Sequence, residues 1–233
     1  MFKRYFQYVV YLVLAIGFSS AKAGAYEDFF KSVINDDARQ VEQLLSRGFD
    51  PNSRDEKGQN LLYLSQRDGA FKVAQVLLDH PQIRIDQPNN AAETALMMAA
   101  LRDHDTWVTR LLDKGARIEG LADAGQPGWT PLHYAAAAPG SKALTVLLAR
   151  GARVDARSPN GTTPLMMAAQ YGPEDAVLAL LKQGADVRLR NALDLGPADF
   201  AQRGGREALA SQLGEDDQLF DQDLGGRTDR FLG

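Results

Sequence analysis

One phrase recurs four times along this 233-residue chain at nearly constant spacing. Its copies begin at Asn60, Thr94, Thr130 and Thr163, so the intervals are 34, 36 and 33 residues by subtraction. The last copy reads Thr-Pro-Leu-Met-Met-Ala-Ala, and the other three are close variants of it. A repeat of this length predicts a stack of similar supersecondary units, each of which contacts only its neighbours. Such stacks present an extended surface and commonly bind other molecules.

A second phrase, Leu-Leu-x-x-Gly, keeps the same interval and indicates that each unit holds two helices. The first helix should begin at the Thr, a good N-cap, with Pro131 or Pro164 at the first helical position. The second helix should end at a glycine in the left-handed conformation. We predict that Trp107, Leu112 and Leu148 lie in the core. The four closing glycines are Gly48, Gly115, Gly151 and Gly184.

These phrases resemble ankyrin repeats, and the segment 128–136 is the closest match to that family's Thr-Pro-Leu-His signature. The resemblance implies an all-α solenoid of helix-turn-helix pairs with short β-hairpin loops and polar caps at both ends. It covers residues 26–215, with about six helix-pair units. Local deviations are expected at His80-Pro81, which replaces a closing Gly, and in the longer hairpin 120–128. The predicted boundaries are an N-cap at 26–54, repeats at 55–88, 89–124, 125–157 and 158–190, and a C-cap at 191–215.

The first 25 residues have the layout of a secretory signal peptide, with a basic start, a short apolar run and small-x-small cleavage sites. We predict cleavage after Ala25, with Ala23 as the second choice; an uncleaved N-terminal anchor is the alternative. Loss of three basic residues would take the net charge from −4 to −4 − 3 = −7. That charge argues against nucleic-acid binding. With no cysteine in the chain, these features favour a periplasmic protein, and full secretion is the alternative.

Residues 216–233 are acidic and contain few apolar side chains. Such a segment cannot bury enough surface to order itself, so we predict a flexible tail. The alternative is a linear binding motif around Leu219-Phe220 or Phe231-Leu232.

Residue patterns for catalysis, metal binding and cofactor binding are missing from the sequence. The three histidines have no metal-ligand spacing, and there is no phosphate-binding Gly loop, nucleophile elbow or dinucleotide fingerprint. We therefore expect no catalytic residues, no metal and no cofactor. By resemblance, His133 implies a structural hydrogen bond between adjacent turns. An enzyme or small-ligand binder remains a weaker alternative.

The ankyrin resemblance implies that loop tips and the exposed side of each first helix form a concave binding face. Trp129 stands just before one Thr-Pro phrase and has two readings: an interface anchor, or packing against the hairpin 120–128. The main candidates for partner contact are Trp129, Tyr171, Arg102, Arg67, Asp68, Gln59, Glu93, Asn160, Thr162 and Gln170. The repeat pattern also leaves Arg54, Glu56, Lys57, Asn90, Leu101, Gln126 and Arg157 free.

The sequence thus predicts a monomeric, non-catalytic scaffold that binds a protein partner in the bacterial periplasm. By resemblance it is an accessory protein for a secreted enzyme or a neutraliser of a toxin. No stable membrane insertion is expected after signal cleavage; an uncleaved anchor would instead give an envelope-tethered adaptor.

Overall fold

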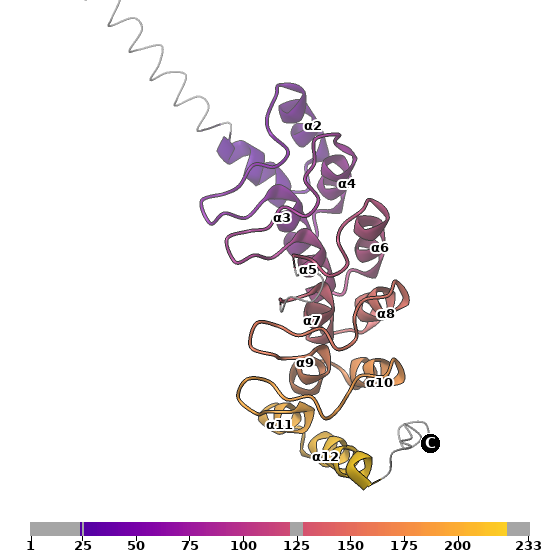
Figure 1. Ribbon diagram of the computed structural model, residues 1–233. Helices are drawn as coiled ribbons and strands as arrows, with labels where there is room; N and C mark the ends of the chain where they lie inside the picture. Colours follow the sequence, from indigo (N-terminus) through magenta and orange to yellow (C-terminus); the bar gives the residue numbers. More distant parts are fainter. Residues whose placement is uncertain (1–23, 25, 122–127, 223–233) are drawn as a thin grey trace, which may run out of the picture.

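The computed structural model describes residues 24, 26–121 and 128–222, with side chains described as far as Glu215. Within these ranges the chain forms six successive helix pairs, as predicted, and Figure 1 shows them stacked in two columns. The first helix of the first pair covers residues 26–34. The other first helices, called inner helices here, are α3 (Leu61–Asp68), α5 (Ala95–Leu101), α7 (Pro131–Ala136), α9 (Pro164–Tyr171) and α11 (Pro197–Arg203). The second helices, called outer helices, are α2 (Ala38–Ser46), α4 (Phe71–Asp79), α6 (Asp105–Asp113), α8 (Lys142–Ala149), α10 (Glu174–Lys182) and α12 (Glu207–Gln222).

The inner helices begin where the recurring phrase begins. The Thr94 and Thr163 hydroxyls accept hydrogen bonds from the backbone N–H groups of Met97 and Met166. Pro131 and Pro164 are the first residues of α7 and α9, where a missing N–H costs nothing. The sequence prediction of these helix starts is confirmed.

The outer helices end as predicted at glycines with positive φ angles. These angles are +87° at Gly48, +95° at Gly115, +86° at Gly151 and +83° at Gly184. Helix α4 is the exception that the sequence indicated. It closes at His80 in an extended conformation, φ −70° and ψ 129°, and Pro81 follows.

The core runs between the two columns and consists mainly of leucine, valine and alanine. Trp107 is 4% exposed, which confirms its predicted burial. The prediction for Leu112 and Leu148 was wrong by one position: Leu111 and Leu147 are fully buried, while Leu112 and Leu148 are only partly buried. Small alanines in the inner helices allow close approach, and Ala99, Ala135 and Ala168 have no exposed surface. The helix–helix contacts follow this pattern, because α5 lies against α3 and α7, and α9 lies against α7 and α11.

A series of side-chain acceptors joins the first five units to one another through backbone N–H groups. Each bond connects residues 31 to 34 positions apart, so every acceptor belongs to one unit and its donor to the following one. Such bonds act only between neighbours, as expected for a repeat stack. The pairs are Asn52 Oδ1 with Arg84 N, Asp86 Oδ1 with Arg117 N, Glu119 Oε1 with Arg153 N, and Asp155 Oδ1 with Asp186 N.

The C-terminal unit differs from the prediction. Helix α12 continues to Gln222, past the boundary placed at residue 215, so part of the segment predicted as a flexible tail is helical. The remaining tail residues, 223–233, lie outside the described residues. The Arg206 guanidinium caps α9 from this unit, because its Nη1 donates to the carbonyls of Ala168, Ala169 and Gly172.

The loops before the inner helices contain little regular β-structure. In the described ranges the only β-bridge outside strands joins Arg54 and Asn60. These loops project on the side of the inner helices away from the outer column (Figure 1). The expected all-α fold is therefore observed, with hairpin-like loops in place of strand pairs.

Candidate functional site

The candidate site is the inner face, defined here as the exposed side of the inner helices together with the loops that precede them. Each fully described loop is closed by one polar side chain that accepts a hydrogen bond from the backbone N–H four residues later. Such a loop is fixed before any partner arrives, which lowers the entropy cost of binding. The acceptor–donor pairs are Asp55–Gln59 at 2.7 Å, Asn89–Glu93 at 2.9 Å, Ser158–Thr162 at 2.9 Å and Asn191–Leu195 at 3.1 Å.

Hydrogen bonds also run from one loop to the next. The Asn60 side chain donates to the carbonyl of Gln87 at 2.8 Å. Ala192 N donates to the carbonyl of Asn160, also at 2.8 Å. The loops therefore form a connected row instead of separate fingers.

In the N-terminal half of the inner face, polar side chains bond to one another. The Glu93 carboxylate accepts hydrogen bonds from Tyr63 Oη at 2.8 Å, Tyr134 Oη at 3.0 Å and Asn89 Nδ2 at 2.7 Å. Since Tyr63 lies on α3 and Tyr134 on α7, one carboxylate links helices two units apart. Burial and the neighbouring Glu93 carboxylate raise the pKa of both tyrosines, so both hydroxyls stay protonated donors at neutral pH.

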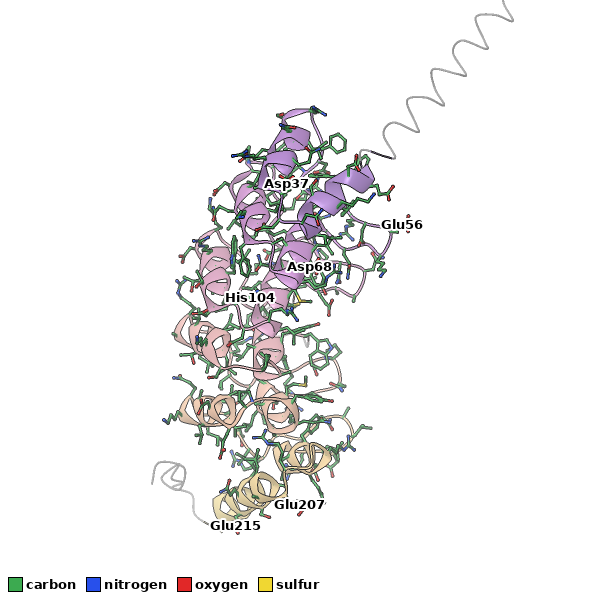
Figure 2. The ribbon with its side chains drawn as sticks, turned by 180° about the vertical axis from the view of Figure 1, so that it is seen from behind. Asp37, Glu56, Asp68, His104, Glu207 and Glu215 are labelled. Carbon is green, nitrogen blue, oxygen red and sulfur yellow. The ribbon has the colours of Figure 1, made fainter. Side chains whose placement is uncertain are left out.

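Arg67 extends this polar group at the end of α3. Its Nε and Nη2 each lie 2.7 Å from a carboxylate oxygen of Asp68, and its Nη1 donates to Gln59 Oε1 at 2.8 Å. The hydrogen bond to Asp68 is the main reason why the pKa of Arg67 is raised. Three predicted candidates, Gln59, Arg67 and Asp68, are thus paired with one another, and a fourth, Glu93, is paired with Tyr63, Tyr134 and Asn89. Asp68 lies at the turn between α3 and α4 (Figure 2).

The centre of the inner face is organised around His133 on α7. Its Nδ1 lies 2.9 Å from Thr130 Oγ1 and its Nε2 lies 3.0 Å from the carbonyl oxygen of Thr162. This bond joins adjacent units, as the sequence indicated. Burial is the main cause that lowers the pKa of His133 to about 4, so the ring is neutral at pH 7.

Trp129 lies edge-on against the His133 ring, with centroids 5.3 Å apart, and 38% of its surface is exposed. The two interpretations of this residue, an interface anchor or packing against the hairpin 120–128, stay predictions. The indole packs locally, against His133, and still presents an aromatic surface to solvent. Most of the hairpin considered as its packing partner, including Gln126, lies outside the described residues.

The other candidates differ in their accessibility. Tyr171, at the end of α9, is 60% exposed; Arg102 and Asn160 are exposed, and Gln170 is half-buried. Thr162 is only 2% exposed, so its expected place on the binding surface was wrong. Its N–H is bonded to Ser158 and its carbonyl lies against His133, which holds this short side chain against α7.

Sequence reasoning missed Tyr63, Tyr134 and Asn89. Tyr63 occupies the phrase position that holds Met97, His133 and Met166 in the other units. A hydroxyl at a buried position needs a hydrogen-bond partner, and this requirement was a usable signal for an acceptor nearby.

Among the described side chains, no group of three or more His, Cys, Asp or Glu residues is arranged to hold a metal ion. No described helix has the length and apolar character needed to cross a membrane. Nearly all of the predicted signal segment lies outside the described residues.

Comparison with known families decides the classification. The family profile for ankyrin repeats matches residues 29–122 and 119–191, with three copies. The chain belongs to the ankyrin repeat family. The ankyrin repeats account for the helix pairs, the closing glycines and the loops of the inner face.

A solved structure is similar to these ankyrin repeats with a TM-score of 0.67 and 26% sequence identity. The match covers 80% of this chain and 96% of the other chain. It comes from the complex of the predatory endopeptidase Bd0816 from Bdellovibrio bacteriovorus with the immunity protein Bd3460. The ankyrin fold and this similarity to a protein–protein complex support a protein-interaction scaffold.

Proposed function

We propose that this protein is a non-catalytic scaffold that binds one protein partner on the inner face of its ankyrin repeats. The observation that carries the proposal is the row of bonded loops beside the exposed Trp129 and Tyr171. Rigid loops lose little entropy on binding, and exposed aromatic side chains supply most of the binding energy in many interfaces.

The proposed partner is an exported enzyme, and the proposed role is to neutralise it. This choice is supported by the similarity to a structure in which an endopeptidase is bound to an immunity protein. The accessory role, in which binding assists the enzyme, is the second candidate. The two roles are separated by the partner's activity, which falls on titration with a neutraliser and is kept or raised by an accessory protein.

The proposed location is the periplasm, reached through a signal peptide cleaved after Ala25. The proposal rests on the basic start and short apolar run of the first 25 residues. Mass spectrometry of the protein isolated from the envelope fraction tests it, with an expected first residue of Tyr26. Recovery of chains that begin at Met1 would instead support the tethered adaptor.

Affinity capture from periplasmic extract tests the partner proposal. The wild type and the double variant Trp129→Ala/Tyr171→Ala are used side by side, with Phe71→Ala as a control for an aromatic residue exposed on an outer helix. We expect one protein that is retained by the wild type and by the control and is lost from the double variant. Equal retention by all three would contradict binding through the inner face.

A further inference from the structure

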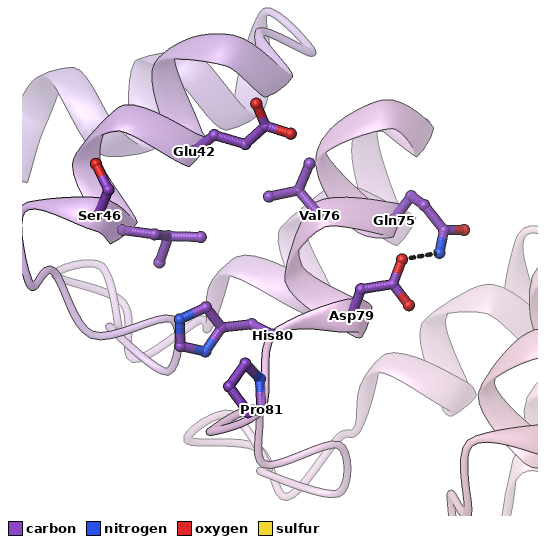
Figure 3. A pocket seen from close by; sticks show the side chains of 8 residues that line it. Glu42, Ser46, Gln75, Val76, Asp79, His80 and Pro81 are labelled. Atoms are coloured by element: carbon purple, nitrogen blue, oxygen red, sulfur yellow. Dashed lines mark hydrogen bonds between the residues drawn. The ribbon is translucent and has the colours of Figure 1, made fainter.

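A groove of about 520 Å³ lies on the outer side of the stack, between α2 and α4. Figure 3 shows it from close by: Glu42 extends from α2 toward α4, and His80 points toward α2 from the end of α4. The apolar part of its wall is formed by Leu45, Val76 and Pro81. This groove lies among the outer helices and shares no residue with the inner face.

Basic side chains bridge the next two joints between neighbouring outer helices. Between α4 and α6, Arg110 Nη1 donates to Gln75 Oε1 at 2.9 Å and Lys114 Nζ lies 2.8 Å from Asp79 Oδ1. Between α6 and α8, Arg150 Nη1 lies 2.9 Å from Asp113 Oδ1. In each case an arginine or lysine of the later unit reaches an acceptor on the earlier one.

The joint between α2 and α4 lacks these cations. Helices α2, α4 and α6 each have nine residues and begin 33 and 34 residues apart, at positions 38, 71 and 105. In this register Val76 stands where α6 has Arg110, and His80 stands where Lys114 follows α6. Neither position holds an arginine or lysine, and both Val76 and His80 line the groove.

One of the two acceptors of the same joint has a charged counterpart here, whereas the position of Asp79 is taken by Ser46. Glu42 on α2 occupies the register position of Gln75, which accepts the hydrogen bond from Arg110 in the next joint. Its side chain is exposed and has no hydrogen bond or ion pair with any described residue. Asp79, on the opposite wall, is already bonded to Gln75 and Lys114. The groove therefore combines an apolar floor with one unpaired carboxylate, which suits the aliphatic stem and charged head of a basic side chain.

We propose that this groove binds an arginine or lysine side chain presented by a partner protein, in the way that Arg110 and Lys114 fill the next joint. The chain's own repeats supply the template for the occupant, and the charge of Glu42 supplies the complementarity. The site is independent of the inner face, so it gives the scaffold a second point of attachment on its opposite side.

Three capped tripeptides, acetyl-Gly-Arg-Gly-amide, acetyl-Gly-Lys-Gly-amide and acetyl-Gly-Gln-Gly-amide, serve as probes of the groove. Each is titrated into the purified protein at low salt, and backbone amide shifts are followed by NMR. We expect saturable shifts confined to residues 42–46 and 75–81 with the Arg and Lys peptides, and much smaller shifts with the neutral Gln peptide. Added salt should weaken the response, because exposed charges are screened.

Three variants of exposed or half-buried residues give the decisive comparison. Glu42→Gln should weaken Arg-peptide binding about two- to fivefold, as expected for loss of a surface ion pair. His80→Lys, which supplies the missing cation, should suppress binding and raise the melting temperature slightly. Glu174→Gln, which removes a carboxylate from another outer helix, should change nothing.

The proposal is overturned if the Gln peptide produces equal shifts, or if none of the peptides produces shifts at the groove. It is also overturned if Glu42→Gln and Glu174→Gln have the same effect, or if His80→Lys binds the peptide as well as the wild type does. Circular dichroism of each variant confirms that the helical content is retained.

Discussion

The two halves of the inner face use the same repeat positions in different ways. In the N-terminal half, Glu93 accepts hydrogen bonds from Tyr63 and Tyr134, and Arg67 donates to Gln59 and Asp68. In the C-terminal half, Trp129 and Tyr171 leave aromatic surface in solvent, and neither side chain has a hydrogen bond to a described residue. A paired polar group must break its own hydrogen bonds before it can bind a partner, whereas an exposed aromatic ring has no hydrogen bond to break. We therefore assign orientation to the first half and affinity to the second.

The largest expected effect separates stability from binding. Trp107→Ala should lower the free energy of unfolding by about 3–5 kcal/mol, as other buried aromatic truncations do. The ring is buried between α4 and α6, where it stacks on Phe71 at 5.6 Å and lies 5.1 Å from the Arg110 guanidinium. Urea unfolding measures the loss. A loss below about 1 kcal/mol would contradict the assignment of Trp107 to the buried core between α4 and α6.

The next largest effect is the pH dependence of stability that His133, which lies between the two halves, should cause. The pKa of His133 is lowered from 6.5 to about 4, so the unfolded chain takes up a proton between these values that the native chain does not. The contribution of neutral, buried His133 to the free energy of unfolding is fully present above pH 6.5 and is lost as the pH falls toward 4. The shift of 6.5 − 4 = 2.5 corresponds to about 3 kcal/mol. His104, whose pKa is also lowered by burial, acts in the same direction.

Urea unfolding at several pH values between 7 and 4 tests this expectation. His133→Gln can still donate to the Thr162 carbonyl but does not titrate, so its stability should depend less on pH. Parallel curves for the variant and the wild type would show that other groups control the acid sensitivity.

Trp129→Ala tests the affinity assigned to the C-terminal half. A residue at the centre of an interface costs about 2 kcal/mol or more when truncated, so partner binding should weaken at least about 30-fold. The loss of stability should be smaller than for Trp107→Ala, because Trp129 is 38% exposed and Trp107 is 4% exposed. Calorimetric titration measures the change in partner affinity, and thermal melting of the same sample measures the change in stability. If the variant binds the partner normally but has a lower melting temperature, Trp129 serves local packing and does not contact the partner.

The smallest effect tests the orientation assigned to the N-terminal half. Tyr134→Phe removes one of the three hydrogen bonds to Glu93 and keeps the ring, so stability should fall by about 1 kcal/mol. Partner binding should change less than about threefold. If binding instead falls tenfold while stability is unchanged, the polar network itself contacts the partner and the contrast between the halves fails.

The repeated phrase made the stack, the helix starts and the closing glycines predictable, because local rules of capping and left-handed glycine apply in every unit. Leu111 is fully buried and Leu112 only partly buried, because Val108 and Leu111 are three residues apart, the spacing of one buried helix face.

The inner face was only partly predictable, since its arrangement depends on contacts between units. Trp129 and Thr162 both stand just before an inner helix, yet one is exposed and the other is buried. The difference comes from side-chain length and from the bond of the Thr162 carbonyl to His133. The link from Tyr63 through Glu93 to Tyr134 spans three units, and no single unit's sequence indicates it.

The acceptors that join the first five units to one another also bear on how such a chain can change in evolution. Asp86 and Glu119 each accept a hydrogen bond from a backbone N–H of the following unit, so these two consecutive joints have the same kind of donor and acceptor. A duplicated unit would bring its own acceptor for the next unit and its own N–H for the previous one. The gene can therefore gain or lose whole units without leaving an unmatched joint, and the length of the inner face can be fitted to a partner in steps of one repeat.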